Sequence, residues 1–217
     1  MIGALKLVTA ATDKPVSLAE ARQYLKIDSD QTAEDALIDA LIATATETCR
    51  QFTGRELVNQ TWWLFLDDFP GSTGGPWWDG VREGALTEIP SARRWIELPR
   101  PPLVSVTHVK TYDDADVGTI FAATNYFVDT ARVPARVVLR STASWPVVDR
   151  VANGIEVEFV AGHGTNAESV PGPLRRGILL LVAELFEQRQ ETVTGTIVAS
   201  VPHNVAALWR PFRIVTL

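Results

Sequence analysis

The organisation of this chain is decided by one stretch, Ile96-Glu-Leu-Pro-Arg-Pro-Pro-Leu-Val-Ser-Val-Thr-His-Val-Lys-Thr-Tyr112. Two short runs of strand-forming residues are joined across Pro99, Pro101 and Pro102. The stretch lies in a β-rich middle, with a helical segment before it and another after it. This arrangement is typical of a structural protein that works through its surfaces, and it does not resemble an active site.

Around this stretch, from Gln60 to about Gly164, the hydrophobic pattern predicts strands and no helix. Since no helix-length pattern lies between the strands to form a crossover, we expect antiparallel pairing. A bulge is expected in the third run, where the alternation is imperfect. The predicted strands are Trp62–Leu66, Trp95–Leu98, Val104–Tyr112, Tyr126–Val128, Val137–Leu139 and Ile155–Val160.

The last of these strands alternates most cleanly. Ile155, Val157 and Phe159 alternate with Glu156 and Glu158. A strict period of two predicts one buried face and one face in water, so both glutamates are expected to be solvated.

The flanking segments have the pattern of amphipathic helices. Ser17-Leu-Ala-Glu20 is a capping box, and Gly54 is a favourable left-handed stop. Apolar residues recur at spacings of three and four before Gly54, which marks one buried helix face. The predicted helices lie near 17–25, 33–53 and 173–189, with a short C-terminal helix near 203–209.

Together these segments predict an α+β fold, in which a small helical bundle carries an inserted antiparallel β-domain. The helical body comprises residues 1–58 plus 165–217, and the β-rich insertion comprises residues 59–164. A glycine-rich stretch at 71–92 is predicted to be a long flexible loop.

Composition narrows the range of functions. The 217 residues carry a formal net charge of −6, which argues against a protein that grips phosphate backbones. Cys49 is the single cysteine, so no internal disulfide forms, in keeping with a reducing compartment. We expect neither a signal peptide nor a membrane span.

The residues that could carry chemistry do not form a recognisable set. His108, His163 and His203 lack metal-ligand spacing, and His163 fits a turn between two glycines. The Gly71–Gly75 run lacks the Gly-Lys-Ser/Thr of a phosphate loop. The aspartates at 67–68 and 113–116 are expected to favour turns rather than bind calcium. We therefore predict no catalytic, cofactor-binding or metal-binding residues.

Tryptophan is abundant, with seven residues. Trp77 and Trp78 lie in the polar 71–92 loop, where exposed aromatic rings are suited to docking on a protein partner. We expect them to contact a protein partner, and the resemblance described next implies that this partner is a tail component or a neighbouring subunit.

The ordered set of segments resembles the phage head-tail connector, or adaptor, proteins of the gp6-like group, in the variety with a β-rich insertion. This variety occurs in tailed phages, prophages and gene transfer agents. No single motif is diagnostic, and the order carries the match. The matching segments are Pro15–Leu25, Asp35–Ala45, Phe52–Trp62, Leu98–Val106, Val160–Gly164 and Pro173–Val182.

The resemblance implies a dodecameric ring between the portal protein and a stopper or tail-terminator protein. DNA would pass through its channel without specific binding. The subunit would be made in the bacterial cytoplasm and lie at the head-tail junction of the particle. The resemblance also implies portal contact by the C-terminal segment, and we expect removal of residues 205–217 to leave the subunit folded. The residues assigned to the portal are Val205, Leu208, Trp209, Phe212, Ile214 and Leu217.

Two alternatives belong to other functional classes. Trp77 and Trp78 would serve a carbohydrate- or ligand-binding β-module by stacking on sugars. A hydrolase with a dispersed Ser/His/Asp set is the other, although no Gly-x-Ser-x-Gly elbow marks a nucleophile.

Overall fold

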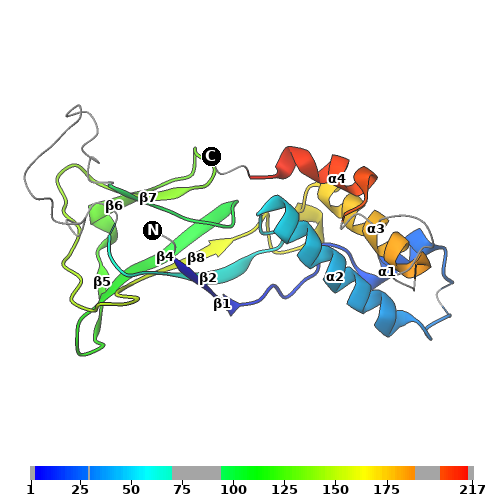
Figure 1. Ribbon diagram of the computed structural model, residues 1–217, viewed down its shortest axis with the longest axis horizontal. Helices are drawn as coiled ribbons and strands as arrows, with labels where there is room; N and C mark the ends of the chain where they lie inside the picture. The colour runs from blue at the N-terminus through cyan, green and yellow to red at the C-terminus, as the bar shows by residue number, and fades with distance from the viewer. Residues whose placement is uncertain (1–2, 29, 70–93, 189–200, 215–217) are drawn as a thin grey trace, which may run out of the picture. The chain divides into compact units, whose positions relative to one another are not determined.

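The part of the chain that the computed structural model describes contains four α-helices, and the first of them begins with a side-chain cap (Figure 1). The Ser17 hydroxyl accepts from the Glu20 amide while the Glu20 carboxylate accepts from the Ser17 amide, which is the predicted capping box. The helices are α1 (Leu18–Leu25), α2 (Asp35–Thr53), α3 (Gly172–Glu187) and α4 (His203–Trp209). The described residues are 3–28, 30–69, 94–188 and 201–214.

Chain contacts divide the protein into two units, each described here by itself. The β unit comprises Met1–Ala10 and Gln60–Ala161, and the helical unit comprises Ala11–Asn59 and Gly162–Leu217. Residues 1–10, which the sequence analysis placed in the helical body, therefore belong with the strands. Their apolar run forms a strand that pairs with the start of the β-rich middle.

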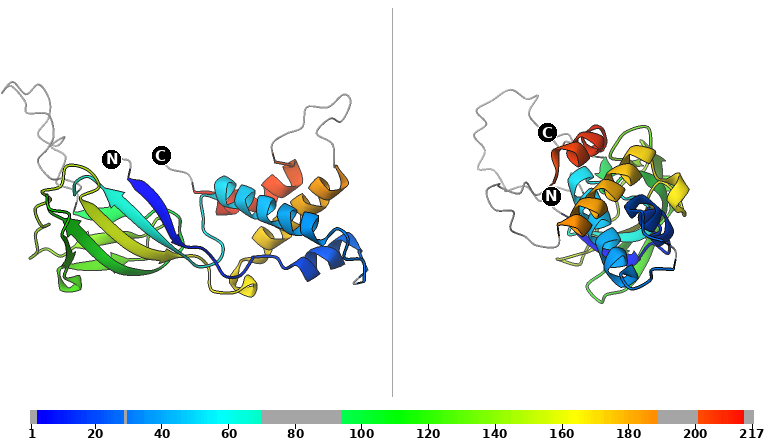
Figure 2. Two further views of the ribbon diagram at one scale, coloured as in Figure 1. Left: turned by 90° about the horizontal axis from the view of Figure 1, so that it is seen from below. Right: turned by 90° about the vertical axis from the view of Figure 1, so that its right-hand side faces the viewer.

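The core of the helical unit is formed by one face of α2 packed against α3 and α4 (Figure 2). Ile38, Ile42, Ala45 and Cys49 recur at the predicted spacing and are fully buried. Gly54 ends α2 in the left-handed conformation with a φ of 71°. Because α3 is apolar nearly all round, it contacts α1, α2 and α4.

Gly177 of α3 forms a notch that receives the Trp209 indole of α4. A Cβ at position 177 would lie 2.2 Å from the indole Nε1, so no larger residue fits without movement. The indole Nε1 donates a hydrogen bond of 3.3 Å to the carbonyl of Leu174, and its ring lies 5.8 Å from that of Phe52. A fully buried tryptophan thus joins the C-terminal helix to α2 and α3.

The described strands of the β unit pair antiparallel, as the sequence predicted, and they form two sheets. The first has the strand order β1-β2-β8-β4-β5, and the second has the order β3-β7-β6. The strands of the first sheet are β1 (Ala4–Thr9), β2 (Gln60–Leu66), β8 (Ile155–Ala161), β4 (Leu103–Tyr112) and β5 (Gly118–Phe121). Those of the second are β3 (Trp95–Glu97), β7 (Arg136–Leu139) and β6 (Tyr126–Asp129).

The two sheets share one hydrophobic core. Leu64, Val109 and Val157 from the five-stranded sheet join Ile96 and Val137 from the three-stranded sheet. Each sheet therefore keeps an outer face directed away from the other sheet, as in a sandwich.

The proline-rich stretch carries the chain from one sheet to the other. β3 and β4 belong to different sheets, and the Pro101–Pro102 peptide between them is cis. Arg100 has a φ of 62°, in the left-handed region. The predicted irregularity of β4 is confirmed, because its register against β8 shifts between Leu103 and Ser105 and again between Val106 and His108.

The ends of the β-rich middle lie beside each other. Gln60 of β2 pairs with Ala161 of β8. In the helical unit, the His163 amide donates to the Leu57 carbonyl and the Asn59 amide donates to the Gly164 carbonyl, both at 2.9 Å. Gly162 permits this approach, since a Cβ there would lie 2.5 Å from the Asn59 nitrogen.

We predict that Gly177→Ala lowers the free energy of unfolding by about 1–3 kcal/mol, because the added methyl group collides with the Trp209 indole. Urea unfolding followed by tryptophan fluorescence measures the change. Gly172→Ala in the same helix is the control, because a Cβ there meets nothing within 4 Å. Equal stability of the two variants would contradict the close packing of the Trp209 indole against Gly177.

We also predict that the Cys49 thiol is inert in the folded protein. Burial raises the pKa of this thiol to about 12, so almost no reactive thiolate exists at neutral pH. A colorimetric disulfide reagent should react only after urea is added. A Cys49→Ser chain carrying Ala40→Cys, at an exposed position of α2, should react at once.

Candidate interaction surfaces

The C-terminal segment is fastened to the helical unit. Val205 and Trp209, both assigned to portal contact, are fully buried in the core. This burial is incompatible with the expectation that the subunit stays folded without residues 205–217, because truncation would remove the side chain that fills the notch. These two residues support the segment from within.

The residues after α4 are held mainly through backbone atoms. The Arg55 guanidinium donates from Nε to the Phe212 carbonyl at 2.6 Å, and the Ile214 amide donates to the Thr53 carbonyl at 2.9 Å. Leu208, Phe212 and Ile214 remain half-buried and present part of their surface to solvent. Leu217, like Trp77, Trp78 and the whole 71–92 loop, lies outside the described residues.

The outer face of the five-stranded sheet contains a buried carboxylate. Glu156 of β8, expected to be solvated, is 2% exposed. Its Oε1 lies 2.9 Å from His108 Nε2 and accepts from Lys110 Nζ at 3.2 Å, and its Oε2 accepts from the Tyr112 hydroxyl at 2.8 Å. Glu156 is not solvated because three alternate residues of β4 project from the same face and cover it. These residues are His108, Lys110 and Tyr112.

The electrostatics of this cluster favour the ionised carboxylate. Burial alone would raise the pKa of Glu156, but hydrogen bonds from His108, Tyr112 and Lys110 outweigh it, so the pKa is lowered. The pKa of Tyr112 is raised, by burial first and then by the Glu156 carboxylate. With both groups stabilised in their ordinary neutral-pH forms, the cluster is built to hold β4 against β8.

An aromatic pair lies beside this cluster on the same face. Trp63 Nε1 donates to Glu158 Oε2 at 2.6 Å, and its ring meets Phe65 edge-on at 5.9 Å. The Lys6 ammonium lies 5.3 Å from the Trp63 ring centre. The half-buried aromatic rings and the internally paired charges of this face suit contact with another protein.

The histidines do not form a catalytic set. His163 occupies the predicted turn between Gly162 and Gly164, and burial together with the nearby Arg55 charge lowers its pKa. His203 is exposed at the start of α4, and His108 serves the Glu156 cluster.

The aspartates at 113–116 form the predicted hairpin turn. Asp113 Oδ1 accepts from the amides of Ala115 and Val117. Within the described ranges, no group of three or more His, Cys, Asp and Glu side chains is placed to hold a metal ion. No described helix has the length and apolar character needed to cross a membrane.

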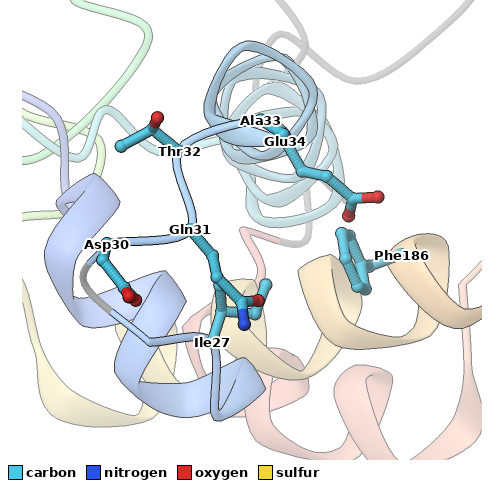
Figure 3. A pocket seen from close by; sticks show the side chains of 7 residues that line it. All are labelled: Ile27, Asp30, Gln31, Thr32, Ala33, Glu34 and Phe186. Carbon is cyan, nitrogen blue, oxygen red and sulfur yellow. The ribbon is translucent and has the colours of Figure 1, made fainter.

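A cleft of about 650 Å³ lies between the α1–α2 connection and the end of α3 (Figure 3). The Phe186 ring forms one wall, and Asp30 and Glu34 give the rim an acidic character. Among its described lining residues there is no histidine, cysteine or serine. Its lining consists of Ile27, Asp30, Gln31, Thr32, Ala33, Glu34 and Phe186.

Solved structures similar to this chain include chains from gene transfer agent particles. A chain in the neck of an empty particle, computed with C6 symmetry, is 25% identical with a TM-score of 0.75, over 99% of this chain and 97% of that chain. A chain from the virion of a native particle is 24% identical with a TM-score of 0.74, over 98% and 96%. A chain in the neck of a native particle, computed with C12 symmetry, is 25% identical with a TM-score of 0.71, over 99% and 97%.

These structures confirm the resemblance to gene transfer agent connector proteins that the sequence indicated. No protein-family model matches the chain, and no curated protein matches it.

We predict that Glu156→Gln lowers the free energy of unfolding at pH 7 by about 1–3 kcal/mol, because the amide cannot satisfy the three donors around it. The folded-state pKa of Glu156 is lowered, so its contribution is complete above the unfolded pKa of about 4.3 and is lost as the pH falls through the folded value. Urea unfolding between pH 7 and pH 3 measures both effects. The gap between wild type and variant should narrow at acid pH, whereas exposed Glu187→Gln should follow wild type throughout.

Proposed function

We propose that this chain is a structural subunit of the neck of a phage-like particle, acting as the adaptor between the head and the tail. The observation that carries the proposal is the agreement of fold along nearly the whole chain, in both units, with chains from gene transfer agent necks. The particle is a tailed phage, a prophage product or a gene transfer agent.

In this proposal the subunits form a dodecameric ring between the portal and a stopper or tail-terminator protein. Support comes from the neck structures computed with C6 and C12 symmetry, since a ring of twelve identical chains is compatible with both. DNA passes through the ring without being bound, in keeping with the net charge of −6.

The portal is contacted by the C-terminal segment through its half-exposed side chains. Leu208, Phe212 and Ile214 supply that surface, while Val205 and Trp209 hold the segment in place from the core. This division of roles separates residues needed for folding from residues needed for docking.

The adaptor role requires no catalysis. The titratable cluster at Glu156 is engaged in holding β4 against β8. The carbohydrate-binding alternative has no support in the described residues, because Trp77 and Trp78 lie outside them.

The proposal is tested by deleting the gene in a strain that makes the particle and restoring it with variants. Deletion should yield filled or empty heads without tails, and the wild-type chain should restore tailed particles in electron micrographs. The double variant Leu208→Ala/Ile214→Ala should restore few tailed particles, because contact area on the portal is lost while the core remains.

The matched control is Leu37→Ala, which shortens an exposed leucine on α2. Urea unfolding of the purified variants separates loss of docking from the loss of stability expected where Leu208 packs partly against the core. Normal tailed particles in the deletion strain would refute the adaptor role. Normal particles with the double variant would refute only the docking surface.

A further inference from the structure

One end of the β unit is strongly acidic. The β4–β5 turn and the connection before β8 meet there, because the Tyr112 amide donates to the Gly154 carbonyl and Arg150 pairs with Asp116. The Asn153 amide donates to Asp67 Oδ1 at the end of β2. This acidic tip holds six aspartates and one arginine, a formal charge of −5: Asp67, Asp68, Asp113, Asp114, Asp116, Asp149 and Arg150.

Apolar side chains stand out from the same tip. Val151 is 90% exposed and Val147 is 82% exposed, the highest values among the exposed large hydrophobic residues. Val117, in the β4–β5 turn, is 59% exposed. These valines add apolar surface to a charged region, which is the combination found where an apolar interface centre meets a polar rim.

The outer face of the three-stranded sheet has the opposite character. Alternation places Trp95, Phe127 and Val138 in one row across the sheet, and Arg136 in the next row between Glu97 and Asp129. We call this surface the arginine face. Its charged residues are four arginines and two carboxylates, a formal charge of +2: Arg94, Arg132, Arg136, Arg140, Glu97 and Asp129.

The guanidinium groups of the arginine face are held in place by the sheet. Arg136 lies 5.3 Å from the Trp95 ring centre and donates to Asp129 at 2.8 Å, while Arg140 lies 5.8 Å from the Phe127 ring centre. Arg94 donates to the carbonyls of Arg140 and Ala143. Arginines stacked on aromatic rings are characteristic of the energetically important residues of protein interfaces.

We propose that the acidic tip of one copy docks on the arginine face of the next copy around the ring. The inference rests on the ring of the proposed function, because a closed ring of identical chains needs two different, complementary surfaces on each subunit. The acidic tip and the arginine face are such a pair, since they carry opposite charge and each adds apolar surface.

The geometry favours a protein partner over nucleic acid on the arginine face. The guanidinium groups of Arg136 and Arg140 lie over the rings of Trp95 and Phe127, so these rings are not open platforms for bases. The acidic tip of the same unit would also repel a phosphate backbone. Binding of duplex DNA by the purified chain, abolished in the arginine variant below, would overturn the assignment.

Charge exchange provides the test. Arg132→Glu/Arg140→Glu changes the formal charge of the arginine face from +2 to −2, and Asp114→Lys/Asp116→Lys/Asp149→Lys changes that of the tip from −5 to +1, all at exposed positions. Either set alone should reduce the amount of chain in purified particles about tenfold or more, because like charges then face each other. The chain that carries all five changes should regain most of the loss, because the two surfaces again carry opposite charge. Asp28→Lys/Glu168→Lys/Glu187→Lys, a change of the same size as that of the tip but in the helical unit, should assemble like wild type.

Cross-linking gives a readout that does not depend on reduced assembly. Particles containing Val133→Cys/Val147→Cys should give a ladder of covalent multimers with a short bismaleimide, because one cysteine adjoins each surface and the contact repeats around the ring. Either single variant should give no ladder. Val104→Cys/Val147→Cys is the control, because residue 104 is exposed but lies on the other sheet.

The outcomes separate the two proposals. If the chain is absent from the neck, the adaptor role fails. The contact between the acidic tip and the arginine face is wrong if the chain is in the neck and one of three results is obtained. The reversed variants assemble normally, the variant with both surfaces reversed folds like wild type but shows no recovery, or no ladder forms.

Discussion

The chain leaves the helical unit after α2 and returns before α3, and everything inserted between these points depends on their staying adjacent. Backbone hydrogen bonds join Leu57 to His163 and Asn59 to Gly164, and the pairing of β2 with β8 continues from Gln60 and Ala161. The absence of a side chain at Gly162 allows the close approach. A large β-rich insertion can therefore be accommodated without separating the helices that pack around Trp209.

In each unit, the side chains that form the core differ from those that lie on the surfaces proposed for recognition. In the helical unit, Trp209 fills the core while its half-buried neighbours on α4 and beyond face outward. In the β unit, the two sheets bury their apolar faces against each other, and their outer faces carry arranged charge and aromatic rings. Separate core and surface residues are what a subunit needs if it must be stable before assembly and must bind other subunits during assembly.

The helices and most strands were predictable because their signals are local. The capping box at Ser17, the stop at Gly54 and the alternation of β8 are readable within a few residues. β1 and β5 are the edge strands of the five-stranded sheet and leave most of their residues exposed, so their pairing partners define them and local pattern did not identify them as strands. The burial of Glu156 and Trp209 depends on residues far away in the sequence, namely three side chains of β4 and the missing side chain of Gly177. The surfaces proposed for assembly likewise bring together residues from separate strands and turns.

The way the C-terminal segment is fastened has an evolutionary consequence. Its anchors engage the main-chain carbonyl of Phe212 and the main-chain amide of Ile214, which any residue other than proline can provide. The exposed side chains of Arg210 and Pro211 take no part in these bonds. If this surface docks on a partner as proposed, selection can rewrite it to follow a changing partner while the segment keeps its position, and recognition would then diverge faster than the fold.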